Sequence, residues 1–367
     1  MTIGTPAPKP GATLVLAWLC LAGMACSGGP PAPPTTAPVT SPPKFTYTSL
    51  RTSGNIAYRV AVFSSGLCHL LCSYADTVAG PPGYDHAEVL LTGWSAENLG
   101  GPTPLQKLTL GSRLVSYDAV TGDIEWEAAA DLRAHAWTGD EYRFTLYVTL
   151  ILTKTAGVQL LQHPNGCSSA GGGECQQRKV LPNAIPAGWD FLALGVRTFT
   201  LEAGAGNPPN GILPSRLALR TRGSRAVGTD FVSQVDCALH DATPTEPMAC
   251  RADLIGIAAA PGEAFTAHFN SGHYAVQFFT FPGVEPPPGQ PIDGAFGGLE
   301  DFLLTFGTST ASRTWSWAAD YNDILLCPDN INFCYNRIGF LGDSLGTAVN
   351  ALKFRLEIAG FAIWTRP

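Results

Sequence analysis

Apolar and β-branched residues in this chain recur in short runs that turn residues separate. The run RFTLYVTLILTK at residues 143–154 is rich in β-branched and aromatic residues and alternates near its start, which is typical of a β-strand. Turn signals such as Thr121-Gly122-Asp123 fall between such runs. The pattern predicts β-strands over residues 87–92, 143–154, 191–202, 274–281 and 352–364.

The spacing that marks an amphipathic helix is missing from every long segment. No long run repeats apolar residues at i, i+3, i+4 and i+7 between helix caps. Short helices are expected only near residues 214–220 and 347–352. The sequence therefore predicts an all-β fold.

The predicted strands also indicate a weak repeat of about 100 residues, a unit size that is typical of β-sandwiches. Similar apolar segments open near residues 87, 190 and 300. We expect two or three tandem β-sandwich units, jelly-roll or Ig-like, with local disulfides. The expected units cover residues 45–165, 166–290 and 291–367, and an alternative is that the third packs with the second. Chance similarity among apolar strands is the alternative to a true repeat.

Composition narrows the class of protein. Glycine and proline together account for 70 residues (40 and 30), and charged residues make up only 14% of the chain. A hydrophobic content of 45% is too high for a disordered protein. The net charge of −7 makes the chain a poor binder of polyanions, because cationic side chains supply most nucleic-acid affinity. A nucleic-acid partner is therefore not expected.

The first 25 residues are expected to be a signal peptide. An apolar run from Leu14 to Ala25 is shorter than the roughly 20 residues that a membrane-spanning helix needs, and it suits the core of a secretory signal. The run is followed by Cys26, and residues 28–43 read GGPPAPPTTAPVTSPP. Such a segment has too little apolar surface to fold and favours extended polyproline II, so residues 26–44 are expected to form a tether.

The segment LAGMAC, residues 21–26, resembles the lipobox of bacterial lipoproteins, in which small residues precede a cysteine that is acylated and becomes the new N-terminus. The resemblance implies that Cys26 is the lipid attachment site and that the membrane is a partner through this anchor. Ser27 is not the aspartate linked with inner-membrane retention, which points to the outer membrane or cell surface. Gly23 departs from the leucine that the pattern prefers, and an ordinary cleaved signal is the alternative.

Eight cysteines remain after the signal segment, and an even number in an exported chain indicates a disulfide framework. We expect sequential pairing, because each close pair falls on one predicted hairpin or loop. A structural zinc site is the alternative, although the spacings do not match the usual zinc motifs. The pairs are Cys68 with Cys72, Cys167 with Cys175, Cys237 with Cys250, and Cys327 with Cys334.

No set of catalytic residues is recognisable. The segment IGFLGDSLG, residues 338–346, resembles the nucleophile block of GDSL esterases, which would make Ser344 a nucleophile. A serine nucleophile needs a base, and no histidine follows Ser344. His268 and His273 flank a predicted hairpin turn, and we interpret them as hydrogen-bonded rather than metal-ligating. No metal or other cofactor is expected.

Trp315 and Trp317 are the best sequence hint of a ligand site. Two tryptophans two positions apart on a strand project from one face, where they could stack on sugar rings, and core packing is the alternative. We therefore expect a lipid-anchored extracytoplasmic surface protein with a non-enzymatic binding, adhesion or structural role and a glycan or protein ligand. The alternatives are a secreted hydrolase with a dispersed active site and a subunit of a cell-envelope complex.

Overall fold

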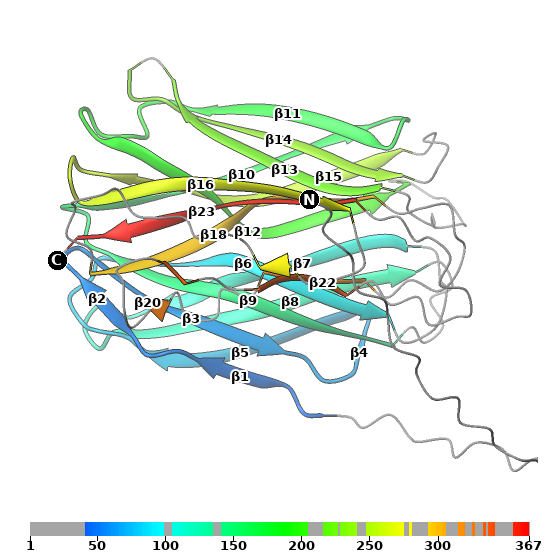
Figure 1. Cartoon of the computed structure of the whole chain (residues 1–367), viewed down its shortest axis with the longest axis horizontal. Coiled ribbons are helices and arrows are strands. Elements are labelled where there is room, and N and C mark those ends of the chain that lie inside the picture. Colours follow the sequence, from blue (N-terminus) through cyan, green and yellow to red (C-terminus); the bar gives the residue numbers. More distant parts are fainter. Residues whose placement is uncertain are drawn as a thin grey trace, which may run out of the picture. The chain divides into compact units, whose positions relative to one another are not determined.

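Every regular element in the described part of the chain is a β-strand (Figure 1). The computed structural model describes residues 41–98, 105–134, 141–204, 216–226, 228–240, 247–274, 279–280, 293–305, 315–319, 325–326, 333–334, 337–341 and 355–366. Within these ranges all paired strands run antiparallel. The prediction of an all-β fold is confirmed. Among the same residues, no helix has the length and apolarity to cross a membrane.

The first sheet has nine strands and carries much of the N-terminal part of the chain. Strand β9 (Glu141–Thr153) alternates between buried and half-buried positions at its start and is buried throughout its second half. Strand β2 (Arg51–Ser53) pairs with β3 (Ile56–Ser64), and β4 (Cys68–His69) pairs with β9. The strands are β1 (Lys44–Tyr47), β3 (Ile56–Ser64), β9 (Glu141–Thr153), β6 (His86–Asn98), β19 (Trp315–Ala319), β22 (Arg337–Leu341) and β17 (Phe279–Thr280) in spatial order, with β2 (Arg51–Ser53) and β4 (Cys68–His69) beside them.

The second sheet has six strands, and the third also has six. In spatial order the second contains β10 (Val158–Ser169), β15 (Met248–Ala259), β12 (Asp190–Ala203), β7 (Leu105–Tyr117), β8 (Asp123–Ala134) and β5 (Leu71–Ala79). The third contains β11 (Glu174–Leu181), β14 (Phe231–His240), β13 (Arg216–Arg225), β18 (Gly294–Thr305), β23 (Arg355–Thr365) and β16 (Ala264–Tyr274). A two-stranded ladder joins β20 (Leu325–Leu326) to β21 (Phe333–Cys334).

The chain passes repeatedly between the second and third sheets. From β10 in the second sheet it continues to β11 in the third and then returns to the second sheet as β12. It next forms β13 and β14 in the third sheet and returns to the second as β15. These strands occupy the upper part of Figure 1. The second sheet takes β5, β7 and β8 from the first expected unit and β12 and β15 from the second, so the two segments share one sheet. The division into units at residues 165 and 290 stays a prediction.

The three sheets meet at one aromatic cluster in the main core. Trp94 on β6, Phe199 on β12 and Phe302 on β18 are each fully buried. Their ring centroids are 5.7 Å apart for Trp94 and Phe199, 5.3 Å for Trp94 and Phe302, and 5.0 Å for Phe199 and Phe302. Such tilted contacts stabilise a core beyond the burial of apolar area. One large side chain from each sheet therefore ties the core together.

The predicted turn at residues 121–123 closes the hairpin between β7 and β8. Gly122 donates its N–H to Asp118 O at 2.7 Å, and Asp118 Oδ1 accepts the N–H of Val120 at 2.8 Å. Gly122 has φ = +83°, and a Cβ atom there would lie 2.4 Å from Gly80 O. Only glycine fits this position, because both the backbone angle and the close neighbour exclude a side chain.

Four predicted strands are present, with slightly different ends: residues 87–92 fall in β6, 143–153 of the predicted 143–154 in β9, and 191–202 in β12. Of the predicted strand 352–364, the described residues 355–364 fall in β23. Of the predicted strand 274–281, Tyr274 ends β16 and Phe279–Thr280 form β17, while the other residues lie outside the described part.

The short helix expected near residues 214–220 is wrong, because the described residues there begin strand β13. Leucine, alanine and arginine favour helices by intrinsic propensity, but pairing with β14 and β18 buries Leu217, Ala218 and Leu219 and overrides that preference. The other expected helix, at residues 347–352, lies outside the described residues.

Candidate functional site

Four cysteines gather where the second and third sheets meet. A disulfide joins Cys167 on β10 to Cys175 on β11, with a Cα–Cα distance of 5.7 Å. A second disulfide joins Cys237 on β14 to Cys250 on β15, with a Cα–Cα distance of 6.3 Å. Each bridge therefore links the second sheet to the third, and both pairs are sequential, as the spacing predicts.

The two disulfides are direct neighbours. Cys167 is the register partner of Cys250 in the β10–β15 ladder, and Cys175 is the register partner of Cys237 in the β11–β14 ladder. The Sγ atoms of Cys167, Cys237 and Cys250 all lie within 4.8 Å of one another. We call this group the four-cysteine cluster. Sulfurs that are bonded in disulfides do not serve as thiolate ligands, so the arrangement holds no metal in this state.

The two bridges differ in exposure. Cys237 and Cys250 are buried, with 4% and 2% of their surface exposed, whereas Cys167 and Cys175 are half-buried near the sheet edges. Strands β10 and β11 are terminal strands of their sheets, which leaves the Cys167–Cys175 bridge open to solvent on one side. A reagent in solution therefore meets this bridge before the inner one.

Two pockets flank the four-cysteine cluster. The larger has a volume of about 700 Å³ and is formed by β10, β11 and β15, with Cys167 and Cys250 in its wall. The smaller has a volume of about 420 Å³ and includes Cys175 and Cys237 in its wall. We call them the large pocket and the small pocket. Volumes of a few hundred Å³ are in the range of small-molecule sites.

Hydrogen-bonding side chains line the large pocket. Lys179 and Arg251 are cations, and Asp253 is the carboxylate. Lys179 Nζ donates to Pro164 O at 2.7 Å, which holds the amine at the pocket edge. The remaining polar side chains of the wall are Asn165, Ser168, Gln176 and Gln177.

A buried polar contact positions Asn165 between the sheets. Its Nδ2 donates to Ser233 Oγ of β14 at 2.9 Å, and its Oδ1 accepts the N–H of Gly166 at 2.8 Å. Both Asn165 and Ser233 are buried, so these bonds satisfy groups that would otherwise be costly to bury. The amide at the pocket wall is therefore held in one orientation.

His163 lies just behind this wall and is 2% exposed. Its ring packs edge-on against Phe231 at a centroid distance of 5.2 Å. Burial lowers the pKa of His163, and the nearby charge of Lys179 lowers it further. His163 is therefore neutral at neutral pH.

An ion-pair chain extends from the large pocket into the first sheet. Asp253 Oδ2 lies 3.5 Å from one guanidinium nitrogen of Arg197 on β12, and Glu88 Oε2 lies 3.4 Å from another. Gln162 Nε2 also donates to Glu88. Glu88 is 3% exposed, and these partners offset the cost of burying its carboxylate.

Charged groups of both signs line the small pocket. Arg216 lies 2.7 Å from Glu174, and His240 Nε2 lies 3.5 Å from the same carboxylate. Arg220 and Asp236 complete the charged wall. These pairs are partly exposed and each contributes little to stability, but they make the pocket strongly polar.

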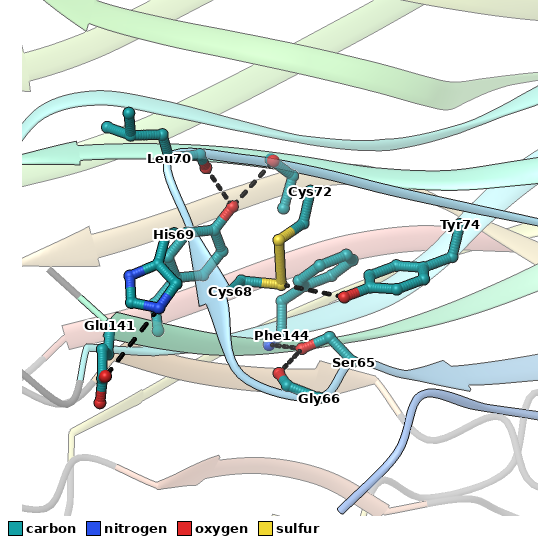
Figure 2. Close-up of a disulfide and its surroundings, with 11 residues drawn as sticks. Ser65, Gly66, Cys68, His69, Leu70, Cys72, Tyr74, Glu141 and Phe144 are labelled. Carbon is teal, nitrogen blue, oxygen red and sulfur yellow. Dashed lines mark hydrogen bonds and ion pairs between the residues drawn. A yellow bond between two sulfur atoms is a disulfide. The ribbon is translucent and has the colours of Figure 1, made fainter. Parts of the chain in front are cut away.

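The third disulfide lies apart from this cluster and joins β4 of the first sheet to β5 of the second sheet (Figure 2). It joins Cys68 to Cys72, and Leu70 between them has φ = 55°, a conformation that non-glycine residues seldom adopt. Tyr142 donates its hydroxyl toward Leu70 O, which holds the loop on β9. Ser65 Oγ accepts the N–H of Phe144 at 2.8 Å beneath the bridge.

Several predicted site residues lie outside the described part of the chain. They include the expected lipid attachment residue Cys26, the proposed disulfide partner Cys327, and Ser344 of the esterase-like segment. Only the backbone of Cys334 is described, on β21 opposite Leu325. The fourth disulfide and the role of Ser344 stay predictions.

Trp315 and Trp317 lie on β19, which pairs with β6 of the first sheet. Trp317 is the register partner of the buried Trp94, and Trp315 is the partner of Ala96. Their side chains are outside the described part of the structure. A ligand site at these two residues stays a prediction.

The segment between His268 and His273 is not a hairpin turn. Residues 264–274 form one continuous strand, β16, which pairs with β23 along its whole length. Its asparagine, serine and glycine residues resemble a turn, but ladder hydrogen bonds to β23 keep the segment extended. His268 Nδ1 lies 2.9 Å from Glu300 Oε1, and this hydrogen bond raises the pKa of His268.

Sequence reasoning missed the large pocket and the convergence of two cysteine pairs. The wall residues come from three segments of the chain, and no spacing within one segment places them together. The one usable signal is that each close cysteine pair falls on one predicted hairpin or loop. No protein-family model matches the chain, and no significant match to it is found among curated proteins.

Proposed function

We propose that this chain is a lipid-anchored extracytoplasmic surface protein that binds a hydroxyl-rich glycan in the large pocket without altering it. The observation that carries the proposal is the polar wall of that pocket, in which side-chain amides, a hydroxyl, two cations and a carboxylate surround a space of about 700 Å³. Such groups are complementary to sugar hydroxyls, which both donate and accept hydrogen bonds.

Three disulfides support an exported location. They join Cys68 to Cys72, Cys167 to Cys175, and Cys237 to Cys250. Disulfides persist in oxidising compartments and are rare in the reducing cytosol of most organisms. The lipobox-like segment at Cys26 and the proline-rich tether would then hold the folded part at the outer membrane or cell surface.

The proposal also includes the finer architecture. Within it the second and third sheets face each other as the layers of a β-sandwich. The buried bond between Asn165 and Ser233 and the contact of His163 with Phe231 both span these sheets, which supports this arrangement.

Glycan-array binding of the full chain tests the function. Lys179→Ala removes a cation from the large pocket and is expected to weaken binding of the best ligand at least about tenfold. Arg178→Ala is the matched control, because Arg178 is a neighbouring exposed cation on β11 that lies outside the wall of the large pocket. Failure of the array to identify any ligand, or equal loss in both variants, contradicts the proposal.

A further inference from the structure

The four-cysteine cluster brings together four sulfurs that can pair in two ways. In the observed pairing, Cys167–Cys175 and Cys237–Cys250 both connect the second sheet to the third. In the alternative, Cys167–Cys250 and Cys175–Cys237, each bridge would join register partners within one sheet. We propose that the four-cysteine cluster is a thiol–disulfide exchange site at which a small thiol converts the first pairing into the second.

The backbone geometry permits both pairings. The observed bridges have Cα–Cα distances of 5.7 and 6.3 Å. Directly opposite residues of antiparallel strands have Cα atoms about 4.5 to 5.5 Å apart. A disulfide accepts Cα–Cα distances of about 4.4 to 6.8 Å. The alternative bridges therefore need new sulfur positions but no change of strand register.

The sulfurs are also close enough to exchange. Cys167 Sγ lies within 4.8 Å of both Cys237 Sγ and Cys250 Sγ, although it is bonded to neither. If the outer bridge opens, a Cys167 thiolate already faces the inner bridge. Thiolate attack on a disulfide sulfur is the elementary step of disulfide exchange.

The reaction needs only a catalytic thiol and balances without an oxidant. A small thiolate attacks Cys175 Sγ, so that a mixed disulfide forms, the Cys167–Cys175 bond breaks, and its electron pair leaves on Cys167. The Cys167 thiolate then attacks Cys250 Sγ, which breaks the Cys237–Cys250 bond and leaves a thiolate on Cys237. Finally, the Cys237 thiolate attacks Cys175 Sγ and releases the small thiolate unchanged.

The pockets give the small thiol its access. Cys175 lies in the wall of the small pocket, which also contains Arg216 and Arg220. Nearby cations favour an approaching thiolate. Cys167 and Cys250, which form the new bond, both lie in the wall of the large pocket. The two buried cysteines react only with a partner that is already inside the cluster.

Exchange would change how the sheets are held. The observed bridges prevent separation of β10 from β11 and of β14 from β15. With the alternative bridges, the second and third sheets would be joined at this point only by the chain connections between these strands and by non-covalent packing. The large pocket lies between β10, β11 and β15, so its walls would become free to move apart. This inference does not depend on the identity of the pocket ligand.

Peptide mapping distinguishes the two pairings. Trypsin releases residues 155–178 with both Cys167 and Cys175, and residues 226–251 with both Cys237 and Cys250. The observed pairing therefore gives two separate peptides, and the alternative gives one cross-linked species. Additional cleavage after Glu174 and before Asp241, by a glutamate-specific and an aspartate-specific protease, separates all four cysteines and identifies the bonded partners.

The full chain is incubated with reduced glutathione at mildly alkaline pH, alkylated with N-ethylmaleimide and digested without reduction. We expect the cross-linked species, with Cys167–Cys250 and Cys175–Cys237 bridges, to appear with time and to be missing from untreated protein. Digests that contain only the two separate peptides overturn the inference, whether or not the outer bridge has been reduced.

A variant tests the exchange step without added thiol. Cys175→Ala leaves Cys167 as a thiol beside the inner bridge, and we expect N-ethylmaleimide to label Cys237 in part of the chains while Cys167 is bonded to Cys250. Labelling of Cys167 alone overturns the inference. Cys72→Ala is the matched control, because it frees one thiol at a bridge outside the four-cysteine cluster. In this variant we expect N-ethylmaleimide to label only Cys68. Both experiments report connectivity alone, so their failure leaves the proposed glycan binding in place.

Discussion

Glu88 on β6 lies 3.4 Å from Arg197 on β12, so a buried ion pair joins the first sheet to the second. Glu88 is 3% exposed, and the side chain of Arg197 is 17% exposed. Arg197 also reaches Asp253 in the wall of the large pocket. The pair therefore links the packing of two sheets to the position of a pocket residue.

Glu88→Gln is expected to lower the free energy of unfolding by about 3 kcal/mol, because it leaves a largely buried guanidinium without its closest carboxylate. Urea unfolding measures the loss. Asp253→Asn is the control, since that carboxylate is 44% exposed and its removal should cost less than about 1 kcal/mol. Similar losses in both variants would show that burial does not set the strength of this network.

The contribution of each disulfide to the free energy of unfolding should increase with the length of the loop that it closes. Cys237 and Cys250 are 13 positions apart, and Cys68 and Cys72 are 4 apart. Replacing both cysteines of a pair by alanine should cost about 3 kcal/mol for the longer loop and about 2 kcal/mol for the shorter one, because a longer loop restricts the unfolded chain more. Chemical denaturation of the two double variants gives this comparison. The reverse order would contradict it.

Asp301 should make the protein less stable as pH rises toward neutrality. Burial raises the pKa of Asp301 to about 7, although the N–H of Thr221 donates to it. Between about pH 4 and pH 7 the folded state retains a proton that the unfolded state has lost, so stability falls as pH increases and is level above that range. Asp301→Asn should remove the decline and gain on the order of 2 kcal/mol at about pH 8.

Unfolding of Asp301→Asn and the parent chain from about pH 4 to pH 8 measures this difference. The amide oxygen can still accept the N–H of Thr221, so the variant isolates the charge. A constant difference between the two proteins across the range would contradict the prediction.

His163 should have the opposite effect, at lower pH. Its pKa is lowered, chiefly by burial, so the unfolded state binds a proton more readily than the folded state. Above about pH 6.5 this side chain is mostly neutral in both the folded and the unfolded state and does not change stability with pH. As pH decreases from about 6.5 toward the lower pKa of the folded state, the unfolded state takes up the proton first, so the free energy of unfolding falls. His163→Phe keeps an aromatic ring against Phe231 and should flatten this part of the pH profile.

The same series of unfolding curves tests this variant below neutral pH. If the stability of His163→Phe falls below neutral pH as steeply as that of the parent chain, protonation of other groups causes the loss of stability.

Local patterns in the sequence predict the strands but not their neighbours. The alternation at residues 143–154 marks β9, and the glycine turn at residue 122 marks the β7–β8 hairpin. Strand β19 pairs with β6, more than two hundred positions earlier, and nothing in either segment specifies that partner. Residues 216–220 have good helix propensity, and only their sheet neighbours show why they form a strand.

The candidate site was less predictable for the same reason. Close spacing identified the sequential disulfides at Cys167 and Cys237. It could not show that β10 faces β15 and β11 faces β14, which is what brings the two bridges together. The large pocket depends on the same long-range pairing, so its polar wall has no local sequence signature.

The intact mass and the unreduced peptide map of the native protein, purified from its source cells, test the proposed lipid anchor and oxidised state most directly. We predict a chain that starts at an acylated Cys26 and has no free thiol, with Cys167–Cys175 and Cys237–Cys250 among its bridges. An unmodified N-terminus elsewhere would contradict the lipid anchor. Free thiols in the mature chain would contradict the oxidised, extracytoplasmic state on which the proposed function depends.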